Sequence, residues 1–308
     1  MPVIEEAPVT FALDPTERLS TDIKRIAGGQ LDHAVASLLD PDVDDATAVH
    51  EARKSLKKVR AILRLIADEI DEDAYRSDTA AFRGIGVDLS PVRDAAVALE
   101  TFDRYCEPQL DPEDSLRLRA VLVAARGDAS VGMTLRERTA ARIRLERWRI
   151  DEWAIDRRDA RAIVRGLRRA FKKVRSAYAA VLEDHSDESL HEWRKKVKVV
   201  WYHSRLLRAR DADGPHRDVV ELSQLSELLG LDRDLALVRS TLHESGQDDA
   251  VSRIVMMHID DIRSELQSQS KSLGARLFEQ RPKDYVARLL ARFGAPSRDA
   301  LETSTPRS

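Results

Sequence analysis

Residues 49–64 read VHEARKSLKKVRAILR, and residues 190–205 read LHEWRKKVKVVWYHSR. Both segments keep the pattern apolar-His-Glu-x-Arg-Lys-x-x-Lys, at an offset of 141 residues from His50 to His191. Apolar and charged residues recur in them every three or four positions, as in an amphipathic helix. On a helical wheel each histidine shares one face with the cations that follow it, and Val59 or Val200 lies opposite. The two segments therefore predict two equivalent helices, each with a cationic face and a buried face.

A second motif repeats in the same order along the chain. LSPVRDAAV at 89–97 is matched by LLGLDRDLALV at 228–238, with an offset of 140 residues from Arg93 to Arg233. Two different motifs at nearly one spacing indicate an internal duplication with repeats of about 140 residues. The fold class that follows is all-α: a duplicated helical bundle in which neighbouring helices run antiparallel.

The composition agrees with a helical protein. The 308 residues are 43% hydrophobic and 34% charged, while aromatic residues make up only 5%. A many-stranded sheet would need more β-branched and aromatic runs. Periodicity, caps and prolines predict helices over residues 16–39, about 44–66, 72–85, 90–106, 112–126, 134–150, 155–183, 188–210, 216–229, 232–245, 247–279 and 282–294.

The predicted organisation has a disordered lead-in at 1–15, a first half at 16–150, a second half at 151–294 and a disordered tail at 295–308. The single cysteine, Cys106, excludes an internal disulfide. The amino terminus has no basic and apolar leader, and no apolar run reaches the roughly 18 residues of a membrane span. We therefore expect a cytoplasmic protein with no membrane partner.

The charge of the repeated helices is one-sided. Six Lys or Arg residues stand between Val49 and Arg64 against one acid, Glu51. Like charges three or four residues apart cost an isolated helix about 0.2–0.5 kcal/mol per pair, and a solvated surface normally mixes both signs. The same one-signed face in both repeats indicates an anionic partner. Because the cations span several turns, a linear polyanion fits better than a compact metabolite.

Other interpretations of these helices stay open. Either face can be an ordinary solvated surface, and each histidine can serve as a helix cap or an interhelical hydrogen-bonding residue. A nucleic acid is disfavoured as a partner because it normally stacks on exposed aromatic residues; the first helix has none among its cations, although Trp201 and Tyr202 adjoin the second set.

A metal-dependent phosphohydrolase is the third alternative. Such an enzyme needs carboxylates to hold Mg²⁺, which the cationic faces lack, and neither an H-E-x-x-H motif nor a Walker glycine loop is present. We expect no enzymatic activity, no metal and no cofactor. A scaffold for an acidic protein partner is a further alternative, and the sequence does not fix the oligomeric state.

The quoted helices resemble the paired signature helices of the CHAD domain, the histidine-bearing α-helical domain. LSPVRDAAV and LLGLDRDLALV resemble the segment that follows in each half, and GARLFEQRPKDYVARLLARF at 274–293 is similar to that family's closing helix. The likeness covers about residues 16–294. It implies two four-helix-bundle-like halves related by a pseudo-twofold around a basic groove, non-catalytic binding of inorganic polyphosphate and association with polyphosphate granules. The family is often fused to a CYTH domain, for which these residues leave no room, so we expect a stand-alone member.

The resemblance also implies which residues contact polyphosphate. In the first repeat they are His50, Arg53, Lys54, Lys57, Arg60 and Arg64, here called the first stripe. In the second repeat they are His191, Arg194, Lys195, Lys198 and Arg205, the second stripe, with Trp201 standing at the counterpart of Arg60. Weaker candidates on the preceding helices are Lys24, Arg25, Arg168, Arg169, Lys172 and Lys173.

Two further expectations concern neighbours of the stripes. An anion next to either histidine should raise the pKa of its imidazole. Arg93-Asp94 and Arg233-Asp234 fit internal ion pairs and ligand contacts equally well.

Overall fold

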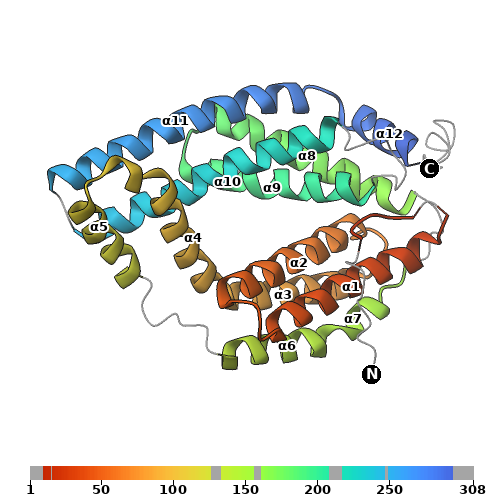
Figure 1. Cartoon of the computed structure of the whole chain (residues 1–308). Helices are drawn as coiled ribbons and strands as arrows, with labels where there is room; N and C mark the ends of the chain where they lie inside the picture. The colour runs from red at the N-terminus through yellow and green to blue at the C-terminus, as the bar shows by residue number, and fades with distance from the viewer. Residues whose placement is uncertain are drawn as a thin grey trace.

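The computed structural model describes residues 10–14, 16–125, 133–155, 161–207, 217–246 and 249–293, and every element of secondary structure within them is helical (Figure 1). The elements are α1 (Leu19–Leu39), α2 (Asp45–Leu65), α3 (Glu72–Asp88), α4 (Ser90–Tyr105), a 3₁₀ turn (Glu107–Gln109), α5 (Pro112–Ala125), α6 (Met133–Glu146), α7 (Trp148–Asp151), α8 (Arg161–Glu183), α9 (Asp187–Leu206), α10 (Arg217–Glu244), α11 (Ala250–Phe278) and α12 (Pro282–Arg292). The all-α prediction is confirmed.

Side-chain caps fix where the two signature helices begin. The carboxylate of Asp44 accepts a hydrogen bond from the Thr47 amide at the start of α2. The Ser186 hydroxyl accepts one from the Ser189 amide at the start of α9. Each cap satisfies an amide that has no partner inside the helix, which typically stabilises the helix by about 1 kcal/mol. Both stripes therefore start from a defined first turn.

The second half departs from the predicted helix pattern. Two helices were expected at 216–229 and 232–245, but α10 is one continuous helix through Gly230. At the matching place in the first half, Leu89 ends α3 and Ser90-Pro91 begins α4. Proline restricts the residue before it and lacks an amide hydrogen, so it breaks the helix, whereas a lone glycine only weakens it. The likeness of the two motifs concealed this difference.

The amino-terminal segment also differs from expectation. Phe11, Ala12 and Leu13, assigned to a disordered lead-in, are buried in the core. The amide of Leu13 donates to the Leu206 carbonyl at 2.7 Å, at the end of α9. The remainder of the lead-in, apart from residues 10 and 14, and the tail at 295–308 lie outside the described residues, as do residues 156–160 of the predicted helix at 155–183.

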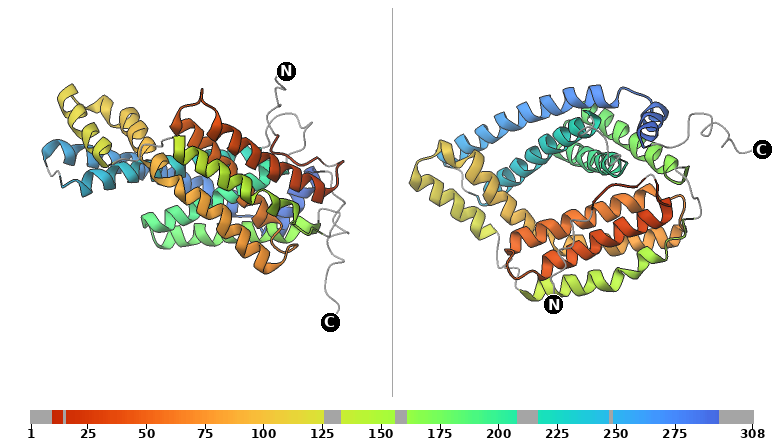
Figure 2. Two further views of the ribbon diagram at one scale, coloured as in Figure 1. Left: turned by 90° about the horizontal axis from the view of Figure 1, so that it is seen from below. Right: turned by 45° about the vertical axis from the view of Figure 1, so that its right-hand side comes forward.

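The helices form two layers joined at one end. Figures 1 and 2 show α1, α2, α3 and α6 in one layer and α8, α9, α11 and α12 in the other, with α4 and α5 reaching from the first layer toward α10 and α11. One apolar cluster takes residues from α1–α3, α6–α9, α12, the start of α10 and the end of α11. A second cluster takes residues from α4, α5, α10 and α11.

Both clusters thus combine residues from the two sequence repeats. The boundary near residue 150, the duplicated bundle and the pseudo-twofold remain predictions.

The two signature helices lie against each other. The Nε2 atom of His203 on α9 is 2.9 Å from the Ala61 carbonyl oxygen on α2, and α8 also packs on α2. Gly166 makes that second approach possible, because a Cβ atom there would lie 1.9 Å from the Leu65 carbonyl oxygen. Helix packing therefore places α2, α8 and α9 side by side, which positions the stripes.

Candidate functional site

Lys57 marks the place where the two stripes meet. Its side chain keeps contact with solvent but lies among four other cations. Desolvation, followed by the charges of Arg53, Arg194, Lys198 and Arg93, lowers the pKa of Lys57 to about 7. Two of these cations belong to the second stripe, so the structure brings both stripes together. Lys198 stands 141 residues after Lys57, which means that equivalent positions of the repeats face one another.

The second stripe is organised around an aromatic ring. The ammonium of Lys198 lies 4.7 Å from the centroid of Trp201, and the guanidinium carbon of Arg205 lies 4.9 Å from it. Cations at this distance from an indole are attracted by the ring quadrupole. Burial and the charge of Arg194 are the two largest causes that lower the pKa of Lys198, to about 8. Trp201, which occupies the position equivalent to Arg60 in the second repeat, thus contacts two cations of the second stripe.

Arg53 is held by main-chain and hydroxyl oxygens. One of its guanidinium nitrogens donates to the Gly86 carbonyl at 2.7 Å and to the Ser90 hydroxyl at 2.6 Å. The Nε atoms of Arg53, Arg60 and Arg194 are buried and have no hydrogen-bond partner among the described residues. The guanidinium of Arg53 is thus held in place, and a guanidinium fixed in this way can bind an anion at little entropic cost.

The repeated Arg-Asp segment places one carboxylate near each of these arginines. Burial lowers the pKa of Arg53 and of Arg194, while Asp94 attracts Arg53 and Asp234 attracts Arg194. Burial is also the largest cause that raises the pKa of Asp234, and Asp94 contributes to the rise. Asp94 and Asp234 therefore lie near each other, on α4 and α10, at one side of the combined stripes.

The two histidines lie at the edge of the cation cluster. Burial and then Arg93 lower the pKa of His50, and burial and then Lys195 lower the pKa of His191. The expected rise depended on a bound anion, and without one the neighbouring cations disfavour the imidazolium form. Both histidines therefore respond to the same local excess of positive charge as Lys57.

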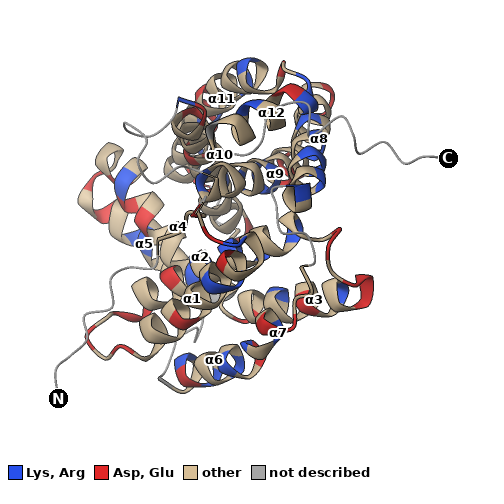
Figure 3. Cartoon of the chain, turned by 90° about the vertical axis from the view of Figure 1, so that its right-hand side faces the viewer, with Lys and Arg blue, Asp and Glu red and all other residues tan. Residues whose placement is uncertain are grey.

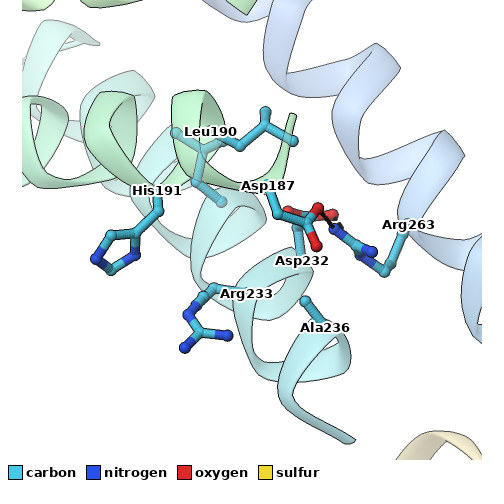
Figure 4. Close-up of a pocket in the computed structure, with 8 residues that line it drawn as sticks. Asp187, Leu190, His191, Asp232, Arg233, Ala236 and Arg263 are labelled. Carbon is cyan, nitrogen blue, oxygen red and sulfur yellow. Dashed lines mark hydrogen bonds and ion pairs between the residues drawn. The ribbon is translucent and has the colours of Figure 1, made fainter. Parts of the chain in front are cut away.

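Figure 4 shows how the start of the second stripe is anchored. Arg263 of α11 donates to Asp232 of α10 at 3.0 Å and also pairs with Asp187 of α9. The side chains of His191 and Arg233 point to the other side, away from these ion pairs (Figure 4). The cavity that these residues line measures only about 10 Å³, roughly the room of one water molecule. The ion pairs thus fix the first turn of α9 while its histidine stays available.

Lys54 and Lys195 have carboxylate partners of their own. The ammonium of Lys54 lies 3.0 Å from Glu51, and Lys195 pairs with Glu192 at the equivalent position. These two members of the stripes are therefore partly neutralised within their own helix, unlike Lys57.

Positive charge continues from the first stripe onto α8. Burial, followed by Lys196, Arg169 and Arg64, lowers the pKa of Lys173. Arg169 pairs with Asp68 at 2.5 Å and donates to the Arg64 carbonyl at 2.8 Å. Arg168 and Lys172 are exposed on the same helix, and Figure 3 shows the gathering of Lys and Arg along α8. Arg169 and Lys173 thus join the end of the first stripe at Arg64.

Lys24 and Arg25 are engaged elsewhere. Lys24 donates to the Asp151 carbonyl at 2.7 Å on α7, and the Nε atom of Arg25 donates to Asp22 at 2.9 Å. Their described partners lie on α1 and α7, so no contact here supports a role in the site.

Several residues near the stripes were not selected from the sequence. Lys58 donates to Gln30 at 2.8 Å and lies 5.3 Å from the ring centroid of Phe11. Arg93, which the sequence offered equally as an ion-pair residue or a ligand contact, acts on Lys57 and His50. Arg83 of α3 acts on Arg60, and no repeat or spacing pointed to it.

Two features are absent from the described residues. No group of three or more His, Cys, Asp or Glu side chains is arranged to hold a metal ion in the described part of the chain. Within the same residues, none of the helices combines the length and the apolar character that a membrane crossing requires.

Comparison with known proteins agrees with this architecture. The crystal structure of the CHAD domain from the plant Ricinus communis is similar over 93% of this chain and 95% of that chain, with a TM-score of 0.56 and 19% sequence identity. At this identity the likeness shows the fold alone. No curated protein matches the sequence. The family model for the CHAD domain matches residues 25–243, which is most of the chain. This protein belongs to the CHAD domain family.

Proposed function

We propose that this protein binds inorganic polyphosphate without transforming it, through the facing cations of α2 and α9. The observation that carries the proposal is the placement of Lys57 among Arg53, Arg194, Lys198 and Arg93. Such a cluster is costly to assemble in a folded chain, because like charges repel and burial disfavours their ionised forms. A ligand with one negative charge per repeating unit compensates several of these cations at once.

The character of the site suits a flexible inorganic chain. Arginine can fork onto two phosphate oxygens, whereas lysine supplies a mobile point charge, so a mixture tolerates sliding of the ligand. The cations extend from Lys198 on α9 through Lys57 to Arg64, Arg169 and Lys173. Binding of this kind gives the protein a means to associate with polyphosphate granules in the cytoplasm.

Titration of long-chain polyphosphate tests the proposal. Lys57→Gln combined with Arg194→Gln removes one cation from each stripe, and the affinity should fall by at least tenfold at low salt. Arg138→Gln combined with Arg144→Gln removes two exposed cations of α6 and should leave the affinity within about twofold. Equal losses in both pairs would show that binding is non-specific.

An RNA of matched phosphate concentration should compete weakly, and phosphate release with Mg²⁺ present would contradict a non-catalytic role.

A further inference from the structure

Residues 11–13, here called the amino-terminal strap, lie where α2 and α9 come together. All three are buried, and the amide of Leu13 donates to the Leu206 carbonyl at the end of α9. The next residue, Asp14, donates its amide to the buried carboxylate of Asp22 on α1 at 2.6 Å. Figure 1 shows this stretch, in red, between the layer of α1–α3 and the layer of α8 and α9. Hydrogen bonds therefore fix the strap to both layers.

The ring of Phe11 has a cationic neighbour on each signature helix. The Lys58 ammonium of α2 lies 5.3 Å from the ring centroid, and the guanidinium carbon of Arg205 on α9 lies 6.0 Å from it. A cation within about 6 Å of an aromatic ring is attracted by the ring quadrupole. Tyr202 of α9 stands edge-on to Phe11, with the centroids 5.9 Å apart, which fixes the orientation of the ring. Phe11 thus attracts one cation from each helix.

The two cations repel each other. Burial, followed by the charge of Arg205, lowers the pKa of Lys58 to about 8. Gln30 accepts a hydrogen bond from Lys58 at 2.8 Å, but this amide carries no charge that could offset the charge of Arg205. The Phe11 ring attracts both cations without occupying their N–H donors. The ring therefore favours an arrangement that the two charges alone would disfavour.

Arg205 is the last cation of the second stripe and lies near two aromatic rings. Its guanidinium carbon is 4.9 Å from the Trp201 centroid and 6.0 Å from the Phe11 centroid. Arg205 and Trp201 belong to the second repeat, whereas Phe11 precedes both repeats. It also precedes residue 25, where the match to the family model begins. One of the two rings beside Arg205 is therefore supplied by a segment outside that match.

We propose that Phe11 is a positioning residue of the polyphosphate site, whose ring holds the partly exposed Arg205 beside Lys58 where the anion can reach it. The inference rests on the proposed function of the stripes and extends it to a segment that neither repeat contains. A phosphate group at Arg205 would offset the repulsion from Lys58. Binding of the ligand and docking of the strap should therefore strengthen each other, each by the same factor.

Titration of long-chain polyphosphate into variants of the full chain tests the proposal. Phe11→Leu keeps an apolar side chain but removes the ring. Its affinity should fall by about two- to fivefold at low salt, as expected for the loss of one cation–π contact. Phe11→Tyr keeps the ring and should bind like the parent chain. Phe102→Leu removes a buried ring from the second apolar cluster and, as the matched control, should leave the affinity unchanged.

Two further measurements separate positioning from a purely structural role. In an Arg205→Gln background, Phe11→Leu should weaken binding much less than in the parent chain, because the ring then has no stripe cation to hold. The amide of Leu13, which donates to Leu206, should exchange its hydrogen several-fold more slowly when polyphosphate is bound. This protection by the ligand should be smaller in Arg205→Gln.

The outcomes distinguish this inference from the proposed function. If the parent chain binds polyphosphate and Phe11→Leu binds it equally well, the positioning role is wrong and the proposed function stands. The same holds if Phe11→Leu costs as much with Arg205→Gln as without it, or if Phe11→Tyr loses as much as Phe11→Leu. A parent chain that does not bind polyphosphate overturns the proposed function and this inference with it. Circular dichroism confirms that each variant remains helical.

Discussion

Under the proposed function, Lys57 should make polyphosphate binding sensitive to pH near neutrality. In the unliganded protein its pKa is lowered to about 7, and the pKa of Lys198 to about 8. A bound polyanion favours the charged ammonium and raises both pKa values, so binding takes up protons. We expect affinity to fall as pH rises from about 6.5 to 9. Titrations in two buffers that differ in ionisation enthalpy measure the proton uptake directly.

Lys57→Arg is the matched control for this effect. Arginine stays charged at all these pH values, so the variant should bind well and show a smaller pH dependence above pH 7. An unchanged pH profile in Lys57→Arg would assign the titration to other groups. Lys198, whose pKa is lowered to about 8, is the first alternative.

The charge of Lys57 should favour binding of the anion but lower the stability of the unliganded fold. Because the folded pKa of Lys57 is lowered from its ordinary value to about 7, the unfolded chain binds more protons between pH 7 and about 10.5. Without ligand, stability should therefore rise with pH across this window. Lys57→Met removes the charge and should stabilise the unliganded protein by about 1 kcal/mol, after allowance for solvent screening, or about 2 °C in Tm.

Thermal unfolding measures both effects: Tm without polyphosphate reports the stability of the fold, and the rise in Tm on adding polyphosphate reports binding. Lys57→Met should unfold at a higher temperature than the parent chain without ligand and gain less from added polyphosphate. Lys195→Met is the comparison, since Lys195 is paired with Glu192 and its loss should not stabilise the chain. A lower Tm for Lys57→Met would mean that its neighbours do not destabilise it.

At the scale of single residues, the sequence predicted which cations share a helix face but not which of them are paired or lie near another helix. The wheel placed Arg53, Lys57, Arg194 and Lys198 on matching faces, and all four meet in the structure. The wheel could not show that Lys54 and Lys195 are paired within their helices. Arg83 escaped notice because its proximity to Arg60 arises from the packing of α3 on α2, which no local pattern encodes.

At the level of elements, two helical glycines differ in whether the neighbouring helix leaves room for a side chain. A Cβ atom at Gly230 of α10 would lie no closer than 3.8 Å to Arg194, which is ordinary contact, whereas one at Gly166 of α8 would lie 1.9 Å from the Leu65 carbonyl oxygen. Gly230→Ala should therefore stabilise the protein by about 0.5–1 kcal/mol through helix propensity. Gly166→Ala should destabilise it by about 3 kcal/mol because α8 must move away from α2.

Chemical denaturation of the two variants provides the measurement. Because Gly166 also sets the approach of Arg169 to Arg64, its variant should bind polyphosphate more weakly as well. A destabilised Gly230→Ala would mean that α10 needs flexibility at that point, contrary to its continuous helix.

Most helices could be predicted from caps and periodicity, and the exceptions have physical causes. The break between α3 and α4 depends on Pro91, whereas the equivalent α10 continues through a tolerated glycine. The burial of Phe11 could not be foreseen, since a short proline-flanked segment has no period. Its ring lies edge-on to Tyr202 at 5.9 Å, a contact that depends on how α2 and α9 come together.

For the whole molecule, the arrangement of two layers determines whether the stripes act as one site. Each stripe alone is a cationic face that solvent and salt screen effectively. Packing α2 against α9 places Lys57 near Lys198, so under the proposed function each would bind the anion in the presence of the other's charge. We therefore expect a short polyphosphate to touch both repeats, and its binding to depend on the pair rather than on two separate contacts.

A double-mutant cycle on Lys57→Gln and Lys198→Gln tests this arrangement. Close pairs that share a ligand are non-additive by about 0.5–3 kcal/mol, whereas independent sites add within about 0.5 kcal/mol. We expect a measurable coupling in polyphosphate binding at low salt. The slope of log affinity against log salt is negative, and in the double variant it should be shallower by about 1.4, if each cation displaces counterions as on a single-stranded nucleic acid. If the losses of binding free energy in the two single variants simply add up in the double variant, the two stripes are separate binding surfaces. Coupling between Lys57 and Lys198 in binding requires that both contact the same ligand segment.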